Sequence, residues 1–556
     1  MTIRFYTSLA LLSLIIFAAC QQQSGTRKKT KTRDTTHYTR QDYIDQTIDS
    51  NYVNQFLTAN TSYDAYDEYI RNFYRKRDFH YAWIDKNGLT EQAGNFINMM
   101  KNDAAYGIKD SSLMTPDLQQ LTDTMLVSDS GLKPGDTAIP RIEMMLTAQF
   151  FAYGNKVWGG LTADSTKDLE WFIPRKKIDM ESLLDSMVAK KNNAFEDDEP
   201  VNRQYILLRQ QLKKLAKIAT DNKWDSIRTS AKSFKKGDSA EVIAQVKYRL
   251  EAFGDLPGTD SSQRFTAVLD TAVRAFQDRM GIKVDGLINK NVLDALNVPV
   301  EDRIRKILLN MERLRWVPIE PTTDYILVNI PQFKMHAYEK GKLAWSANVV
   351  VGKPGANTVI FTKELRYIVF SPYWNVPPGI LSKEVVPGLK RGAGSYLARQ
   401  NMEIVGASGK VVAPGSINFS KYSGGNFPYV VRQKPGGKNS LGKVKFLFPN
   451  EYNIYLHDTP ARYLFGENKR SFSHGCIRVS EPKHLAEWLL RDDSSWTSQK
   501  IDDAMNAGKE KFVTVKDKVP VFIVYFTAFV DHNGQLNFRD DVYGHDQKLA
   551  ATLFGK

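Results

Sequence analysis

The period of the apolar positions changes along this chain of 556 residues. Between residues 51 and 233 the apolar side chains recur at helical spacing. Two such stripes are Tyr63, Tyr66, Tyr69/Ile70, Phe73 and Tyr74, and Ile142, Met145/Leu146, Gln149 and Phe150. Aromatic stripes of this period usually form the core between helices rather than a platform for a ligand. The pattern therefore predicts a helical scaffold domain over residues 51–233.

A shorter helical unit follows over residues 234–299. Three apolar stripes mark its helices, and they contain Val242, Val246 and Leu250, then Leu269, Val273 and Phe276, then Val292 and Leu296. A turn over residues 281–286 separates the second helix from the third. A further stripe from Ile304 to Leu314 predicts a helix within residues 300–320. We expect that helix to pack back on the first helical domain, which makes the three-helix unit an insertion.

From Tyr325 onward the apolar period falls to two, which is typical of strands. The expected strands are 325–330, 334–338, 343–351, 367–370, 519–530 and 535–538, with turns at Gly341 and at Asn533-Gly534. They predict a β-rich domain over residues 321–545, followed by a C-terminal tail over 546–556. Residues 379–445 are rich in Gly, Ser, Asn and Lys, and we expect a long loop there that acts as an inserted lid. The predicted fold class is multidomain α+β.

The N-terminal segment predicts the cellular location of the protein. Residues 1–20 place Arg4, an apolar stretch and two alanines before Cys20, and they resemble a bacterial lipoprotein signal peptide. An ordinary signal peptide that contains a cysteine is the alternative. Residues 21–50 are polar and strongly basic, which predicts a disordered tether beside an anionic membrane. We therefore expect a periplasmic lipoprotein that is anchored to the membrane by a lipid on Cys20.

Composition limits the possible class of protein and its possible partners. Hydrophobic residues make up 42% of the chain, which allows sizeable cores, and no apolar run after residue 20 approaches a membrane span. The formal net charge is +14, but export and the absence of a nucleic-acid motif argue against nucleic acid as a partner. The histidines His336, His484, His532 and His545 lack the spacing of metal ligands. We expect no metal and no cofactor.

Cys476 is the candidate nucleophile. It is one of only two cysteines, and it directly follows Ser473-His474-Gly475. A free thiol titrates near ~8.5, so it needs a base to attack at neutral pH. Glycine lets the backbone bend so that the amides of Gly475 and Cys476 point at a developing oxyanion. These features predict acyl transfer through a cysteine.

His457 is the candidate base. It ends the alternating run Asn453 to His457, in which Tyr455 shares its face while Ile454 and Leu456 face the core. Downstream, we expect Ser480 and Pro482 to begin a helix whose N-terminus favours the thiolate of the nearby cysteine. For His457 to act as the base, the fold must bring its imidazole within hydrogen-bond reach of the Cys476 thiol.

The motif of His457 followed by Ser473-His474-Gly475-Cys476 resembles the signature of the L,D-transpeptidases, whose catalytic domain is of the YkuD type. Arg478 stands where many members have asparagine, and it is similar to the larger YcbB-like members, as is the segment 371–378 that contains Trp374. The run AVRAFQDRMGIKVDG, which ends at Gly286, resembles the three-helix peptidoglycan-binding domain. A small helical domain with a purely structural role is the alternative for that unit.

The resemblance implies a function in cell-wall synthesis. Cys476 would attack the bond before the terminal D-Ala of a tetrapeptide stem, and a neighbouring stem would capture the acyl group in a 3→3 crosslink. It also implies peptidoglycan stems and glycan strands as partners, and acylation by carbapenems. Residues that would orient groups or contact substrate are Ser473, His474, Arg478, Tyr455 and Trp374, although a salt bridge that holds the turn is as plausible for Arg478. An L,D-carboxypeptidase and a non-catalytic cell-wall-binding lipoprotein remain alternatives, and the oligomeric state stays open.

Overall fold

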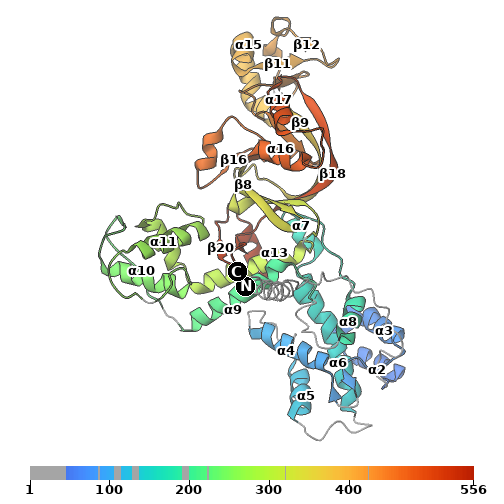
Figure 1. Cartoon of the computed structure of the whole chain (residues 1–556). Helices are drawn as coiled ribbons and strands as arrows, with labels where there is room; N and C mark the ends of the chain where they lie inside the picture. Colours follow the sequence, from blue (N-terminus) through green and yellow to red (C-terminus); the bar gives the residue numbers. More distant parts are fainter. Residues whose placement is uncertain are drawn as a thin grey trace, which may run out of the picture.

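The computed structural model describes residues 46–85, 88–105, 114–127, 137–190, 199–221, 224–258, 260–319, 321–423 and 425–555. The predicted signal peptide with Cys20, and all but the end of the predicted tether, lie outside these ranges. In the part of the chain that is described, no helix combines the length and the apolar character needed to cross a membrane. The described chain forms several bodies around a central pair of helices, α9 (Arg203–Asp221) and α13 (Val300–Trp316) (Figure 1).

The first body is the predicted helical scaffold. Its helices are α2 (Ser50–Ala59), α3 (Asp67–Lys76), α4 (Glu91–Ala105), α5 (Pro116–Val127), α6 (Ala138–Tyr153), α7 (Ala163–Asp168), α8 (Met180–Ala189) and α9 (Arg203–Asp221). Helix α6 is buried along most of its length, and its Glu143 carboxylate accepts hydrogen bonds from the amides of Ala82 and Trp83 at 2.7 and 2.9 Å. The predicted aromatic stripe lies mainly in this core. Tyr69 is the exception, because its side chain is 48% exposed.

The three-helix unit has a separate core. Helices α10 (Glu241–Ala252), α11 (Ala267–Arg279) and α12 (Lys290–Asn297) match the three predicted stripes, and the short strands β4 (Ser233–Phe234) and β5 (Ile288–Asn289) pair beside them. Helix α13 (Val300–Trp316) then packs against α9 and the turn after α6, as its apolar stripe predicted. Figure 1 shows α10 and α11 on one side of this central pair and the scaffold on the other.

The β-rich body is built on a closed sheet. Its strands are β6 (Tyr325–Asn329), β7 (Lys334–Glu339), β8 (Lys342–Gly352), β9 (Ile360–Phe370), β14 (Val444–Leu447), β15 (Leu456–His457), β16 (Ser471–Ser473), β17 (Ile477–Val479) and β18 (Lys511–Val524). All of them except β16, which pairs with β8, follow the order β14-β15-β17-β8-β7-β6-β18-β9. Strand β14 also pairs with β9, which closes the sheet like a barrel. Strand β3 (Trp171–Phe172) of the scaffold adds to β9. Helices α16 (Pro482–Leu490) and α17 (Ser498–Asn506) pack beside the sheet.

The prediction of a long loop over residues 379–445 is wrong. This segment folds into helices α14 (Pro378–Ile380) and α15 (Val386–Gln400), and into a sheet of β10 (Trp374–Asn375), β11 (Met402–Val405), β12 (Val411–Val412) and β13 (Val430–Gln433). It has a hydrophobic core of its own, to which Leu389, Ile404 and Val431 contribute. Its many glycines concealed this apolar spacing. We call residues 374–433 the insertion; it forms the upper end of the molecule in Figure 1.

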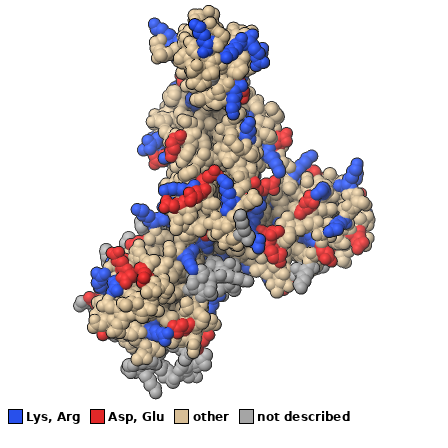
Figure 2. All heavy atoms as spheres, turned by 180° about the vertical axis from the view of Figure 1, so that it is seen from behind, with Lys and Arg blue, Asp and Glu red and all other residues tan. Residues whose placement is uncertain are grey.

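Positive charge is concentrated in and next to the insertion. Residues 379–445 contain eleven Lys and Arg but only two Glu, so they supply +9 of the net charge of +14. Figure 2 shows Lys and Arg side chains crowded at this end of the molecule with few acidic neighbours. By contrast, the lower bodies in that view carry both signs of charge in mixture.

The predicted C-terminal tail is also corrected by the structure. Residues 546–554 belong to helix α18 (His545–Phe554), which packs against α13. The buried carboxylate of Asp546 accepts hydrogen bonds from Arg313 at 2.5 Å and from the hydroxyl of Thr527 at 2.8 Å. The hairpin of β19 (Ala528–Val530) and β20 (Leu536–Phe538) precedes it, around the predicted Asn533-Gly534 turn. The end of the chain is therefore part of the fold.

Candidate active site

The register of two short strands assembles the site. Strands β15 and β17 are parallel neighbours, with Leu456 opposite Ile477 and His457 opposite Arg478. Leu456 and Ile477 are fully buried in the core. Because side chains alternate along a strand, Tyr455, His457, Cys476 and Arg478 lie together on the opposite face. The rings of Tyr455 and His457 are 5.7 Å apart.

His457 is held as a neutral imidazole. Its Nδ1 lies 2.5 Å from the carbonyl oxygen of Asp458, and a carbonyl can only accept a hydrogen bond, so Nδ1 carries the proton. Nε2 is then left with a lone pair that can take a proton from another group. Burial and the positive charge of Arg478 lower the pKa of His457 to about 3. The side chain is only 4% exposed, so it is more enclosed than a histidine on an open cleft.

The thiol of Cys476 is also neutral at rest. Its Sγ donates to the carbonyl oxygen of Asn453 at 3.6 Å, and no hydrogen bond joins it to His457 within the described structure. Burial raises the pKa of Cys476, although hydrogen bonds from Tyr455 and the charge of Arg478 act in the opposite direction. Both partners of the predicted pair are therefore uncharged, and a proton must move when the sulfur attacks.

The predicted effect of a helix N-terminus on Cys476 is wrong. Helix α16 does begin at Pro482, but strand β17 lies between it and the cysteine. Ser480 is not its N-cap; the hydroxyl of Ser480 accepts from the Asn348 amide at 3.1 Å, and Glu481 takes the cap position without a side-chain bond. The helix dipole falls off within about one turn, so it does not reach the thiol.

The turn before the cysteine is closed by Ser473. Its buried hydroxyl donates to the carbonyl oxygen of Cys476 at 2.6 Å and accepts from the Gly475 amide at 3.1 Å. Gly475 has φ +113°, which side chains rarely tolerate. Because its amide is already used, Gly475 does not serve as the predicted oxyanion donor in this conformation. The Cys476 amide donates to no atom of the described residues, and His474 is exposed.

Two residues that sequence reasoning missed hold this turn from behind. The Thr358 hydroxyl donates to the Gly475 carbonyl oxygen at 2.8 Å and accepts from the Gly352 amide at 2.9 Å. The Tyr543 hydroxyl donates to the Gly352 carbonyl oxygen at 2.5 Å and accepts from the Thr358 amide at 3.3 Å. Neither residue lies in a motif, and Tyr543 is brought in from the C-terminal segment. No sequence signal distinguishes them from other threonines and tyrosines.

Arg478 lacks the salt bridge that was one of its two predicted roles. Its guanidinium is half-buried, and its Nε has no hydrogen-bond partner. Among the residues that the structure describes, no carboxylate lies within 4.0 Å of it. Burial lowers the pKa of Arg478, which is the cost of holding an unpaired cation away from water. An anionic group that binds beside Cys476 would relieve this cost.

Trp374, the remaining predicted contact, lies elsewhere. It is in β10 at the base of the insertion and packs against the core of the insertion. In the described chain it has no hydrogen bond or ring contact with residues 473–476, which we call the catalytic turn. The structure thus groups Tyr455, His457, Cys476 and Arg478, and it leaves Trp374 apart.

Comparison with protein families agrees with this architecture. Residues 323–521 match the L,D-transpeptidase catalytic domain of the YkuD type. Residues 68–212 match a scaffold domain, and residues 239–296 match a "Putative peptidoglycan binding domain". The chain therefore carries an L,D-transpeptidase catalytic domain joined to a helical scaffold and a peptidoglycan-binding domain, in a multidomain α+β fold.

A curated relative carries the same name. The chain is 34% identical over 245 residues to the "Putative L,D-transpeptidase" of Haemophilus influenzae, a match that covers 44% of this chain and 49% of the relative. This chain thus spans about half the length of the curated relative that it matches.

Solved structures give a weaker likeness. An L,D-transpeptidase from Stackebrandtia nassauensis is 14% identical, with 53% of this chain and 97% of that chain covered and a TM-score of 0.23. Residues 123–326 of an L,D-transpeptidase from Xylanimonas cellulosilytica are 13% identical, with 53% and 100% covered and a TM-score of 0.17. Likeness at this level leaves the assignment to rest on the sequence matches.

Proposed function

We propose that this protein crosslinks peptidoglycan as an L,D-transpeptidase that works through an acyl-enzyme on Cys476. The observation that carries the proposal is the grouping of a neutral thiol, a neutral imidazole and an unpaired guanidinium on one face of β15 and β17. The family matches of the catalytic and peptidoglycan-binding domains support a cell-wall substrate. The reaction is a 3→3 crosslink between stem peptides.

Attack begins with a proton transfer. Nε2 of His457 takes the proton of the Cys476 thiol, through a small movement or a bridging water, as Sγ bonds to the carbonyl carbon between the third residue and D-Ala. The amide of Cys476 donates to the developing oxyanion. The carbon–nitrogen bond then breaks, and the histidine gives its proton to the departing D-Ala amine. A thioester on Cys476 remains.

The second half of the reaction reverses these roles. The side-chain amine of a neighbouring stem attacks the thioester carbon, and His457 accepts the proton that this amine loses. The carbon–sulfur bond breaks, the sulfur recovers a proton from the imidazole, and the new amide links the third residues of two stems. Arg478 binds a stem carboxylate beside the cysteine, and Tyr455 holds the sulfur by hydrogen bonding.

The insertion serves as the lid in this proposal. A thioester must be shielded from water until an amine reaches it, because hydrolysis otherwise gives a free tripeptide. Helix α15 is interrupted at Gly392, where φ is 161° and ψ is 83°, so its two halves are joined by a bend. The positive charge of residues 379–445 suits the carboxylates of stem peptides.

The proposed location is the periplasm, with the chain anchored by a lipid on Cys20. Replacement of Cys20 by Ala is expected to move the protein from the membrane pellet to the soluble periplasmic fraction. Unchanged membrane association would contradict the lipid anchor without touching the proposed chemistry.

The function is tested by mass analysis of muropeptides after incubation of purified protein with disaccharide tetrapeptide. We expect a dimer with one 3→3 bond and the release of one D-Ala for each dimer. Tripeptide without dimer would replace the proposal by an L,D-carboxypeptidase. Unchanged substrate would reject a catalytic role, and the Cys476→Ala protein provides the blank.

A further inference from the structure

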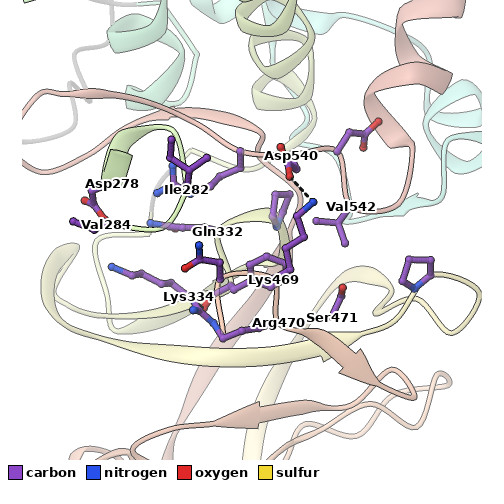
Figure 3. A pocket seen from close by; sticks show the side chains of 17 residues that line it. Asp278, Ile282, Val284, Gln332, Lys334, Lys469, Arg470, Ser471, Asp540 and Val542 are labelled. Atoms are coloured by element: carbon purple, nitrogen blue, oxygen red, sulfur yellow. Dashed lines mark hydrogen bonds and ion pairs between the residues drawn. The ribbon is translucent and has the colours of Figure 1, made fainter. Parts of the chain in front are cut away.

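A pocket of about 370 Å³ lies where three parts of the molecule meet. The peptidoglycan-binding domain contributes the end of α11 and the following turn, including Asp278 and Ile282. The catalytic domain contributes the β6–β7 connection and residues 468–471, and the C-terminal segment contributes residues 539–542. Figure 3 shows Lys334 and Lys469 on the catalytic side and Asp278 across the cavity. The volume is in the range of small-ligand sites.

Direct contacts join the two domains at this junction. Arg539 donates to the Arg279 carbonyl oxygen at 2.7 Å, and the Arg279 guanidinium donates to the Leu536 carbonyl oxygen. Gly281 has φ +66°, and a Cβ added there would lie 2.7 Å from Cδ of Arg539. The turn of the peptidoglycan-binding domain therefore sits directly against the C-terminal segment. The pocket walls are held by contacts that do not depend on a ligand.

The pocket contains more cationic side chains than carboxylates that form ion pairs with them. Lys469 forms an ion pair with Asp540 at 3.1 Å, and both side chains are exposed. Arg470 donates only to the carbonyl oxygens of Glu467 and Phe333 and to the side chain of Asn348, and its Nε has no partner. Lys334 has no ion pair or hydrogen bond from its ammonium group within the described structure.

The acidic side of the pocket does not cancel this charge. The carboxylate of Asp541 is occupied, because it accepts from the Tyr525 hydroxyl at 2.6 Å and from the amides of Asp546 and Gln547. Asp278 is exposed, and it forms no ion pair within 4.0 Å with a cation of the described residues. Arg539 also donates only to carbonyl oxygens and to the side chain of Asn537. Among the described residues, no carboxylate therefore lies within 4.0 Å of Arg470, Arg539 or Lys334, and Asp278, Asp531 and Asp540 act on Arg539 only from further away.

The pocket adjoins the catalytic turn without being part of it. Ser471 lines the pocket and begins β16, which ends at Ser473 of the turn. Pro354 also lines it, and the same loop reaches Gly475 through the hydroxyl of Thr358. A ligand in the pocket would therefore contact the same loop and the same strand that hold the turn of Gly475.

We propose that this junction pocket is a second binding site for peptidoglycan, which takes a carboxylate-bearing stem peptide other than the one being cut. The unpaired cations bind the stem carboxylates, and the walls from two domains fix a polymeric substrate next to the catalytic turn. The inference rests on the proposed function for its substrate class. It adds a site that acts on polymeric peptidoglycan and leaves single fragments unaffected.

The test compares Lys334→Glu with Lys342→Glu in the full-length chain. Lys342 is an exposed lysine at the far end of the β7–β8 hairpin and is outside the pocket, so it matches the charge change. Binding to isolated, insoluble peptidoglycan is measured by sedimentation in the Cys476→Ala background, and turnover of soluble disaccharide tetrapeptide is measured with Cys476 intact.

We expect Lys334→Glu to weaken binding to insoluble peptidoglycan about tenfold, because one charged hydrogen bond is worth about that factor. Turnover of the soluble fragment should stay within about twofold, and Lys342→Glu should leave both quantities unchanged. The difference should vanish on glycan strands from which an amidase has removed the stems.

Equal binding by the two variants would overturn the proposal, and so would a difference that persists on bare glycan strands. Circular dichroism verifies that Lys334→Glu is folded, and Lys334→Gln, which keeps the size of the side chain, should weaken binding by a smaller factor. Absence of turnover by the wild-type protein would reject the proposed function instead, because the binding measurement requires no chemistry.

Discussion

The peptidoglycan-binding domain and the insertion are both separate bodies with their own cores, but they are attached in opposite ways. The first is locked by arginine hydrogen bonds across its boundary: Arg279 donates to the Leu536 carbonyl oxygen, and Arg539 donates to the Arg279 carbonyl oxygen. Inside the domain, Arg279 also pairs with the buried Asp255. The insertion has a single internal ion pair, Arg432 with Glu403, among its described residues, and residues 379–442 form no ion pair with the rest of the described chain. Its base is held mainly by backbone and amide hydrogen bonds, such as that from the Tyr373 amide to Glu510.

In the proposed function, the two bodies have different roles. A domain that holds a polymer must keep a fixed distance to the catalytic turn. A lid must open for each new stem, and unbalanced positive charge opposes tight packing until an anionic substrate arrives. We therefore expect the peptidoglycan-binding domain to act through position and the insertion to act through movement.

The largest effect should come from the chemistry that both bodies serve. Cys476→Ala is expected to abolish turnover while leaving the fold unchanged, because a small thiol contributes little to packing. His457→Ala should lower turnover about 10²–10⁴-fold, since it removes the base. Turnover is measured as dimer formed from disaccharide tetrapeptide, with circular dichroism as the control for folding. Wild-type activity in the Cys476→Ala protein would reject the assignment of the site.

Removal of the insertion should change the ratio of the two products and leave the formation of the acyl-enzyme intact. Asn375 and Arg432 are paired neighbours on β10 and β13, so a short glycine-serine linker can join them in place of residues 376–431. We expect the ratio of crosslinked dimer to free tripeptide to fall, because water reaches the thioester more easily. Alkylation of Cys476 by a small reagent should be as fast or faster. A folded deletion protein with the wild-type product ratio would show that the insertion is no lid.

The two internal ion pairs offer a matched test of how firmly each body is held together. Arg279→Ala removes one member of a pair in which the Asp255 side chain is 2% exposed, and it should destabilise the peptidoglycan-binding domain by about 3 kcal/mol. Arg432→Ala removes a more exposed pair and a contact with the Tyr373 ring, so the insertion should lose only about 1 kcal/mol. Amide hydrogen exchange in α11 and in β11 reports each domain separately. Equal losses would contradict the contrast between a locked and a loosely held body.

Sequence alone could predict the parts of the site that are local. The spacing of His457 and Cys476 is a property of a short segment, and the alternation around Tyr455 follows from one strand. The sequence does not reveal the strand that separates Cys476 from the helix dipole, because β17, with the sequence Ile-Arg-Val, is too short to show a period of two. It predicts a loop in place of the insertion, because the glycines hide the apolar positions of α15. Thr358 and Tyr543 depend on contacts between distant segments, so no local pattern could identify them.

The smallest predicted effect concerns the link between the locked side of the molecule and the catalytic turn. The C-terminal segment contacts the peptidoglycan-binding domain through Arg539. It acts on the turn indirectly, because the Tyr543 hydroxyl bonds to Gly352 and Thr358, and the Thr358 hydroxyl bonds to Gly475. Tyr543→Phe leaves a buried carbonyl and amide without this partner, and the Gly475 turn behind Cys476 should become less fixed. We expect kcat to fall about tenfold with KM changed less than about twofold, because the hydroxyl positions the reacting group and touches no substrate. Thr358→Val should act in the same direction, and Thr358→Ser, which keeps the hydroxyl, should restore most of the rate. An unchanged kcat in Tyr543→Phe would mean that Ser473 alone fixes the conformation of the turn. The contacts between the C-terminal segment and the peptidoglycan-binding domain would then have no effect on the rate of the reaction.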